Sequence, residues 1–275
     1  MKDNIDDKII ENMERKKDKQ RSKKKRKTEE ASAFQSVFDK YTYENIEKIR
    51  RKGVIDRFIG ILSAGKEANV YFAISPEDEP LAIKIYKIDP NNTRWMKSYI
   101  YGDPRFYKIG SSTHKIIYTW ARKEYKNLKR MSKHSIEVPK PIFILKNLLV
   151  MEFIGEKNGT PAPRLKDVEQ VSNPEMLYNE ILDYIWQMFV EAKLVHGDLS
   201  EFNILYYKKK PVIIDVSQAV SIEHPKSLFF LTRDVKNIMK YFRKIIPNYD
   251  FPNEKNIIED IYRSAFHKNK ANESL

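Results

Sequence analysis

The chain contains no cysteine, and this absence narrows the kinds of site that it can hold. With 0 cysteines among 275 residues, disulfides, thiolate metal centres and a cysteine nucleophile are excluded. The 5 histidines show no metal-ligand spacing, so no structural zinc is expected. A lack of cysteine also agrees with an intracellular protein.

Long hydrophobic runs are absent as well. No apolar stretch approaches the roughly 20 residues that a helix needs to span a bilayer. The start of the chain, Met1-Lys2-Asp3-Asn4, does not have the pattern of a signal peptide. We therefore expect a cytoplasmic protein without a membrane partner, whose 41% apolar content is enough for a full core.

One motif places three oxygen-bearing side chains at a characteristic spacing. Asp198 precedes Asn203 by five residues, Asp215 follows Asn203 by twelve, and short apolar runs flank both segments. Phosphoryl transfer from ATP needs hard oxygen ligands for Mg²⁺ and a separate carboxylate that accepts the proton of the attacking hydroxyl. The motif predicts Asp198 as the proton acceptor and Asn203 with Asp215 as ligands of Mg²⁺, or alternatively of Mn²⁺. An ordinary polar loop between two strands is the other interpretation.

A second constellation lies far upstream. Residues 63–71 form a turn of small residues that leads into a strand-like run, and residues 81–86 follow as a second strand. The turn has one glycine, Gly65, so by itself it is a poor match to a glycine-rich phosphate loop. Lys84 lies on the face opposite three aliphatic residues, and spacing alone favours a solvent-facing lysine. Combined with the downstream aspartates, its position instead predicts the cation that reaches the α- and β-phosphates.

A predicted helix over residues 115–131 supports this role of Lys84. Its apolar stripe consists of Ile117, Trp120, Ala121, Leu128 and Met131. Glu124 falls on the same stripe, and a carboxylate turned toward a core is costly unless it is paired. We predict an ion pair between Glu124 and Lys84, with a glutamate that reaches water at the edge of the stripe as the alternative.

Together these motifs resemble the RIO family of atypical protein kinases, first subfamily. The matching segments are the turn at 63–71, the strand at 82–86, the helix at 119–124, the hinge at 149–155, Pro161-Ala162-Pro163, and the loops at 194–203 and 214–218. The resemblance runs from about Tyr43 to Phe242. It implies an α+β, bilobal protein-kinase-like fold with a β-rich N-lobe and a helical C-lobe.

The resemblance also implies roles for individual residues. Asp198 matches the proton acceptor, Asn203 and Asp215 match the Mg²⁺ ligands, and Asp215 also matches the aspartate that the family is thought to phosphorylate transiently. Contacts to ATP are implied for Ser63, Lys66, Lys84, Glu124, Glu152 and Ile154, of which Glu152 and Ile154 are the hinge positions that meet adenine. The chain departs from the family pattern at Ala64, usually Thr, and at Gly197, often Ala.

We predict a basic N-terminal extension at 1–42, an N-lobe with the hinge at 43–154 and a C-lobe at 155–275. Asn173-Pro174-Glu175 begins a C-lobe helix whose buried stripe comprises Leu177, Ile181, Tyr184, Ile185, Met188 and Ala192. Another helix begins at His224-Pro225 and carries on one face Leu228, Leu231, Val235, Ile238 and Phe242. The gap between Asp215 and this helix is too short for the activation segment on which ordinary protein kinases hold a peptide. Phosphate is therefore expected to go mainly to water or to the protein itself.

Residues 91–112 are rich in tyrosine, serine and basic side chains without steady periodicity, and we predict a mobile segment there. It joins the Lys84 strand to the Glu124 helix. Ser98, Ser111 and Ser112 are its candidates for self-phosphorylation.

The formal net charge is +13, and it is concentrated near the start of the chain. Residues 15–27 hold ten basic residues and one acidic residue, a net +9. Such blocks often bind nucleic acid, and a solvated tail that only aids solubility is the alternative. The partner that the resemblance implies is small-subunit ribosomal RNA or a pre-ribosomal particle.

The predicted function is thus a Mg²⁺-dependent ATPase and autophosphorylating serine/threonine-protein kinase that acts in small ribosomal subunit maturation. A small-molecule phosphotransferase of the aminoglycoside or choline kinase type, which shares an HGDxxxxN loop, is one alternative. The other is a non-catalytic RNA-binding scaffold of kinase shape.

Overall fold

The structure is a computed structural model in which residues 38–106 and 109–272 are described. The chain divides into two compact units, residues 1–48 and residues 49–275. Helix α2 (Lys40–Arg51) begins in the first unit, and the other described elements lie in the second. The basic run at 15–27 falls outside the described residues.

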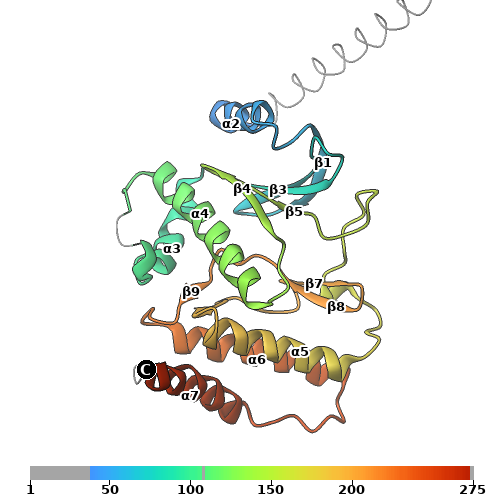
Figure 1. Cartoon of the computed structure of the whole chain (residues 1–275), viewed down its shortest axis with the longest axis vertical. Helices are drawn as coiled ribbons and strands as arrows, with labels where there is room; N and C mark the ends of the chain where they lie inside the picture. The colour runs from blue at the N-terminus through green and yellow to red at the C-terminus, as the bar shows by residue number, and fades with distance from the viewer. Residues whose placement is uncertain (1–37, 107–108, 273–275) are drawn as a thin grey trace, which may run out of the picture. The chain divides into compact units, whose positions relative to one another are not determined.

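A five-stranded antiparallel sheet forms one part of the second unit (Figure 1). In spatial order its strands are β1 (Arg57–Ala64), β2 (Ala68–Ile74), β3 (Pro80–Tyr86), β5 (Leu148–Glu152) and β4 (Pro141–Leu145). Strand β3 is central, and its Lys84 pairs with Val70 on one side and Leu149 on the other. Residues 81–86 are all buried, because both faces of this strand are covered. The solvent-facing alternative for Lys84, which is 7% exposed, is therefore wrong.

Helix α4 (Thr113–Met131) packs against β4 and β5 and matches the helix predicted at 115–131. It begins where the Ser112 side chain accepts a hydrogen bond from the Lys115 amide. All five residues of the predicted stripe are buried, and so is Glu124, which is 1% exposed. The edge-of-stripe alternative for Glu124 is therefore wrong.

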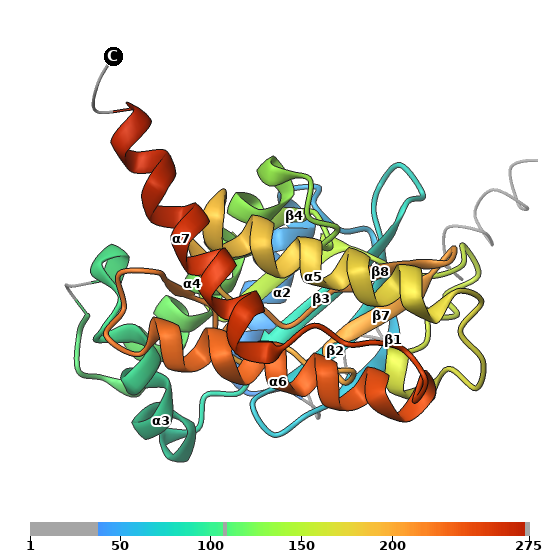
Figure 2. The same cartoon turned by 90° about the horizontal axis from the view of Figure 1, so that it is seen from below.

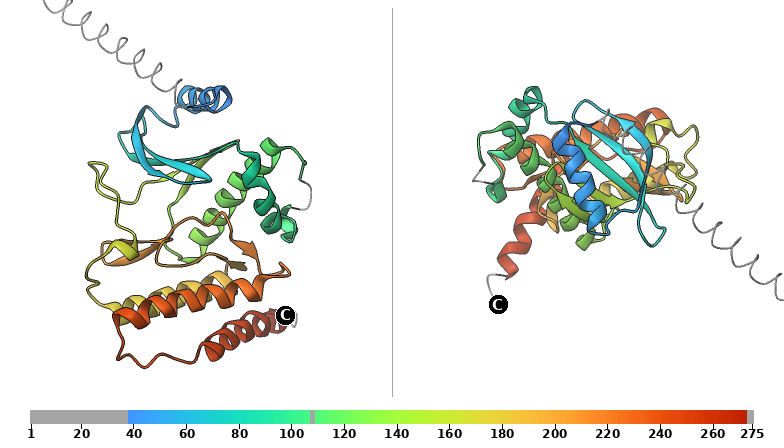
Figure 3. Two further views of the ribbon diagram at one scale, coloured as in Figure 1. Left: turned by 180° about the vertical axis from the view of Figure 1, so that it is seen from behind. Right: turned by 90° about the horizontal axis from the view of Figure 1, so that it is seen from above.

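Helix α3 (Pro90–Ile100) covers the first part of the segment at 91–112, where the sequence showed no steady periodicity and no helix was predicted. Asp89 caps the helix by accepting a hydrogen bond from the Asn91 amide, and Pro90 stands in the first turn. Figure 3 shows α3 beside α4, and Met96 of α3 shares a small core with Trp120 of α4. The capping signal and this contact outweigh the missing apolar period.

The helices α5 (Pro174–Val190), α6 (Ser227–Ile245) and α7 (Glu254–Asn272) form the other part of the unit. Helices α5 and α6 lie side by side and α7 packs against both (Figures 1 and 2). The predicted stripe of α5 is buried throughout. On α6 the prediction is wrong for Leu228, which is 47% exposed because the first turn extends past the core, where Phe230 points inward instead. No helix in the described part of the chain has the length and apolarity needed to cross a membrane.

Two short sheets bring the downstream motifs together. Strands β7 (Ile204–Tyr207) and β8 (Lys210–Ile213) form a hairpin, and the Ile214 amide continues it by donating to the Asn203 carbonyl at 3.0 Å. Asn203 and Asp215 thus flank the open end of one hairpin. Strand β6 (Leu194–Val195) leads into the Asp198 loop and pairs with β9 (Val220–Ser221), which follows Asp215.

Candidate active site

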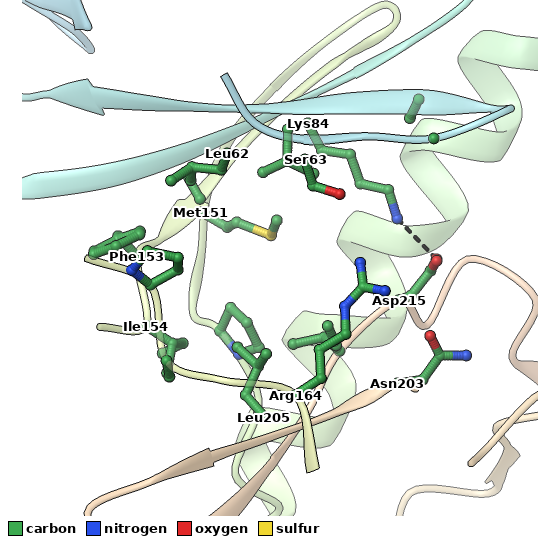
Figure 4. A pocket seen from close by; sticks show the side chains of 18 of the residues that line it. Leu62, Ser63, Lys84, Met151, Phe153, Ile154, Arg164, Asn203, Leu205 and Asp215 are labelled. Carbon is green, nitrogen blue, oxygen red and sulfur yellow. Dashed lines mark hydrogen bonds and ion pairs between the residues drawn. The ribbon is translucent and has the colours of Figure 1, made fainter. Parts of the chain in front are cut away.

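A cavity of about 560 Å³ lies between the five-stranded sheet and the β7–β8 hairpin (Figure 4). Strands β1 to β3, helix α4, the segment after β5 and the hairpin contribute to its wall. Eight of the nine predicted site residues line it: Ser63, Lys66, Lys84, Glu124, Glu152, Ile154, Asn203 and Asp215. The ninth, Asp198, is outside this lining and contacts it through Asn203.

One end of the cavity is apolar. Met151, Phe153 and Ile154 border it, and Leu62 of β1 and Leu205 of β7 lie on opposite sides (Figure 4). Apolar walls of this kind suit a flat aromatic ring, and polar groups at the other end of a pocket can fix the orientation of the ligand that carries the ring. The two predicted hinge residues therefore lie where a nucleobase would fit.

Lys84 dominates the charged end. Its Nζ donates to Glu124 Oε1 at 2.9 Å and to Asp215 Oδ1 at 2.8 Å, so the predicted Lys84–Glu124 ion pair is present. Burial alone would lower the pKa of Lys84, but the two carboxylates outweigh burial and raise the pKa above its usual value. Lys84 therefore stays charged although it is buried.

Two glutamates at this end have raised pKa values. Burial raises the pKa of Glu124 to about 7, with Lys84 acting in the opposite direction. Glu67 of the turn was not predicted as a site residue, yet it also lines the cavity, and burial together with Asp215 raises its pKa to about 7. Two glutamates of raised pKa thus lie near Lys84 and Asp215, and a divalent cation at this end would favour their ionised form.

Asp215 sits in an unusual backbone conformation. Its φ is 57°, in the left-handed region that non-glycine residues rarely adopt. The side chain is 46% exposed, and its Oδ1 accepts hydrogen bonds from Lys84 Nζ and, at 3.0 Å, from Ser217 Oγ. Burial opposes ionisation, but Lys84 and Ser217 outweigh it and lower the pKa of Asp215. The carboxylate is therefore ionised and accessible from the cavity.

Asn203 links the cavity to Asp198. Its Nδ2 donates to the Asp198 carbonyl at 2.8 Å, and Figure 4 shows the amide oxygen on the side of Asp215. The Asp198 side chain accepts a hydrogen bond from Gln218 Nε2 at 3.0 Å. Burial raises the pKa of Asp198, although Arg233 and these two amides act against it. A carboxylate of raised pKa is suited to accepting a proton.

Asp234 of α6 holds the Asp198 loop in place, and sequence reasoning missed it. Asp234 is 2% exposed and accepts hydrogen bonds from the backbone amides of Gly197 at 2.8 Å and Leu199 at 2.9 Å. Gly197 has a φ of +78°, which explains glycine at this position. The available signal was an acidic residue directly beside the apolar stripe position Val235.

Two further residues were missed. Arg164 lines the cavity, and Figure 4 shows its side chain extending from the hinge side toward the end that holds Asp215. Gln218 reaches Asp198 from the segment after Asp215. Gln218 is the last residue of the matching segment 214–218, although no role was predicted for it, whereas the sequence does not distinguish Arg164 from other polar surface residues.

The residues present fit a magnesium ion. Within residues 38–106 and 109–272, no three or more His, Asp or Glu side chains form a ready metal cage. Protein sites for Mg²⁺ with a nucleotide usually supply one or two carboxylates and leave the other positions to phosphate oxygens and water. The ionised Asp215 and the amide oxygen of Asn203 match that requirement.

Known proteins are similar to this chain. A family model described as RIO domain matches residues 69–255. The chain is 39% identical over 243 residues to the RIO-type serine/threonine-protein kinase Rio1 of Haloferax volcanii, a match that covers 87% of this chain and 83% of that one. The chain belongs to the RIO family. The predicted family and the enzyme class, serine/threonine-protein kinase, are thereby confirmed.

Other RIO proteins extend the comparison. The Rio1 kinase of Methanocaldococcus jannaschii is 37% identical over 253 residues, covering 88% of this chain and 86% of that one. The human serine/threonine-protein kinase RIO1 is 40% identical over 217 residues, covering 78% of this chain but 38% of that protein.

A solved structure of a RIO protein shares the fold. The crystal structure of the Rio2 kinase-ADP/Mg²⁺-phosphoaspartate complex from Chaetomium thermophilum matches with a TM-score of 0.61 at 20% identity, covering 79% of this chain and 65% of that one. This likeness confirms the predicted protein-kinase-like fold, with a β-rich N-terminal part and a helical C-terminal part.

Proposed function

We propose that this RIO protein transfers the γ-phosphoryl group of ATP, with Mg²⁺, to serine or threonine hydroxyls of its own chain and to water. One observation carries the proposal: Lys84 bridges Glu124 and Asp215 at 2.9 and 2.8 Å beside an apolar slot that suits adenine. In this proposal residues 43–154 form the nucleotide-binding lobe with its hinge, and residues 155–275 form the catalytic lobe.

Asp215 and Asn203 would hold Mg²⁺, which when bound neutralises the charge that develops on the phosphates. Lys84 would meet the α- and β-phosphates, and Ser63 and Lys66 of the turn would border the phosphate chain. Arg164 adds a further positive charge on the opposite side of the cavity from Lys84. Glu152 and Ile154 would meet the adenine ring at the apolar end.

Asp198 would accept the proton of the attacking hydroxyl or water. Its hydrogen bond from Gln218 and its contact with Asn203 orient the carboxylate, and burial favours the protonated product. Asp215 is also a candidate acceptor. A carboxylate oxygen of Asp215 would attack the γ-phosphorus, ADP would leave, and water would later release the phosphate.

We further propose a role in maturation of the small ribosomal subunit in the cytoplasm, with ribosomal RNA or a pre-ribosomal particle as partner. The basic run at 15–27 supports this, because counterion release from even five or six phosphate contacts gives strong, salt-dependent affinity for RNA. ATP turnover would then act as a conformational timer on the particle.

The test is ATP turnover by the full chain with radiolabelled ATP, scored separately as free phosphate and protein-bound phosphate. We expect turnover that needs Mg²⁺ or Mn²⁺ and rises with small-subunit ribosomal RNA. For Asp198→Ala we expect retained nucleotide binding and about 10²–10⁴-fold slower turnover. For Asp215→Ala we expect loss of Mg²⁺-dependent nucleotide binding together with turnover.

Three outcomes would contradict the proposal. Phosphorylation of a free peptide at a rate equal to or above hydrolysis would refute water and self as the main acceptors. Transfer to sugars or amines would indicate a small-molecule phosphotransferase. Absence of any turnover would indicate a scaffold.

A further inference from the structure

Two side chains of helix α4 donate hydrogen bonds to the backbone that follows Asp215. Lys123 Nζ donates to the carbonyl oxygen of Ser217 at 2.9 Å and also to that of Ala219. The third side of the ammonium group faces the Trp120 ring, 5.3 Å from its centroid. Lys123 is 0% exposed, so all of its interactions are made inside the protein.

Asn127, one turn further along α4, binds the same stretch of backbone. Its Nδ2 donates to the carbonyl oxygens of Val216 at 2.8 Å and Ala219 at 2.9 Å, and it is also 0% exposed. Its Oδ1 accepts a hydrogen bond from Arg105 at 2.8 Å, and Arg105 forms an ion pair with Asp103 at 2.6 Å. This chain of contacts fixes which way the Asn127 amide points.

A lysine at this position is costly for packing alone. Among the described residues it forms no ion pair with a carboxylate, and burial lowers its pKa well below the usual value. Replacing a buried charged group with an apolar side chain of similar volume is often neutral or stabilising. The side chain of Lys123 therefore does not stabilise the core by its packing. Its contribution is the hydrogen bonds that it donates to the carbonyl oxygens of Ser217 and Ala219.

These contacts bear directly on Asp215. On its N-terminal side, the Ile214 amide is bound to Asn203, and on its C-terminal side Asn127 binds the Val216 carbonyl. Asp215 is thus a single residue with φ 57° between two fixed points. The residue next to Lys123 is Glu124, so adjacent positions of one helix orient Lys84 and the backbone beyond Asp215.

We propose that Lys123 and Asn127 are positioning residues that hold Asp215 ready for the metal–nucleotide complex. The inference rests on the proposed role of Asp215 as a metal ligand. It implies that the arrangement of Asp215 is set before nucleotide enters the site.

The test compares ADP affinity with Mg²⁺ and in EDTA for Lys123→Met, which keeps side-chain length and removes the donors. Lys129→Met, exposed on the same helix, is the matched control. We expect Lys123→Met to lose about tenfold of the Mg²⁺-dependent gain in affinity, the equivalent of one buried carbonyl left unbonded. Metal-free affinity should stay at the wild-type value, and the control should match wild type in both conditions.

Asn127→Ala is the second variant, with a smaller expected loss because the Val216 carbonyl still accepts from the Ala219 amide at 3.2 Å and Lys123 still binds the Ala219 carbonyl. The ratio of the two affinities is the readout, since metal-free binding corrects for the folded fraction. A lowered melting temperature with a wild-type ratio in both variants would show a purely structural role and overturn the inference. Asp215→Ala separates the two hypotheses: if it keeps the full Mg²⁺ dependence, the proposed role of Asp215 fails instead.

Discussion

Replacing Asp234 with asparagine tests whether the Asp198 loop rests on a buried carboxyl group. Asp234 accepts hydrogen bonds from the amides of Gly197 and Leu199 at 2.8 and 2.9 Å and is 2% exposed. An asparagine side chain has one acceptor oxygen, so one amide loses its partner. An unsatisfied buried donor costs about 1–3 kcal/mol, and we expect Asp234→Asn to be destabilised by about this amount at pH 5.

The pH dependence gives the sharper result. Burial raises the pKa of Asp234 from 3.8 to about 7, although the two amides act against it. Between these values the native state holds a proton that the unfolded state releases, so the stability of the wild type falls as pH rises. About two units of this window lie between pH 5 and pH 8, and each corresponds to about 1.4 kcal/mol. Asparagine has no such proton, so the stability of the variant relative to wild type should improve by about 3 kcal/mol over that range.

Urea unfolding of both proteins at pH 5 and pH 8, followed by circular dichroism, measures this difference. Glu67, Glu124 and His196 also have shifted pKa values, but they are present in both proteins and cancel in the comparison. Asp183→Asn, on an exposed position of α5, is the control and should differ from wild type by less than about 0.5 kcal/mol. An equal stability difference between Asp234→Asn and wild type at both pH values would refute the reasoning.

Other perturbations address the cavity and the basic extension. Glu124→Gln removes one of the two carboxylates that raise the pKa of Lys84. ATP binding should therefore weaken and turnover should slow by about tenfold or more, in line with the loss of a buried charge-assisted hydrogen bond. Wild-type kinetics would exclude a role for the Lys84–Glu124 pair. Arg164→Gln should weaken ADP binding in calorimetry and leave adenosine binding unchanged, because the guanidinium points to the phosphate end. An equal loss of affinity for ADP and adenosine would instead indicate that Arg164 contacts the adenosine part of the ligand. Because burial raises the pKa of Asp198, kcat should fall as pH decreases through that raised pKa, and Asp198→Asn should flatten this limb of the profile. Deleting residues 1–30 should leave ATP turnover near normal and weaken binding to ribosomal RNA, and unchanged binding at 200 mM salt would remove the extension from the mechanism.

One part of the site that the sequence predicted is set by local geometry. Asn203 and Asp215 meet because one short hairpin separates them, and the apolar runs of that hairpin are visible in the sequence. The Lys84–Glu124 pair was predictable for another reason: a carboxylate on an apolar stripe needs a partner, and the upstream strand offered a lysine. Helix α3 was missed although Asp89-Pro90 signals a helix start, because its apolar residues have no clear period.

Residues whose side chains bind the backbone of a loop could not be predicted from the periodicity of apolar residues. Lys123 and Asp234 are both ionisable and both buried. Each is adjacent in sequence to a position that faces a core, Glu124 and Val235 respectively. A helical pattern assigns such residues to solvent, because it contains no information about the carbonyls or amides that another part of the chain presents. Their partners are the backbone groups of residues 216–219 and of the loop around Asp198, which carry no side-chain signal at all. When the catalytic residues of a chain lie on loops, a charged residue beside an apolar stripe should therefore be tested for hydrogen bonds to loop backbone. It should not be assigned to the solvent-exposed surface from the helical pattern alone.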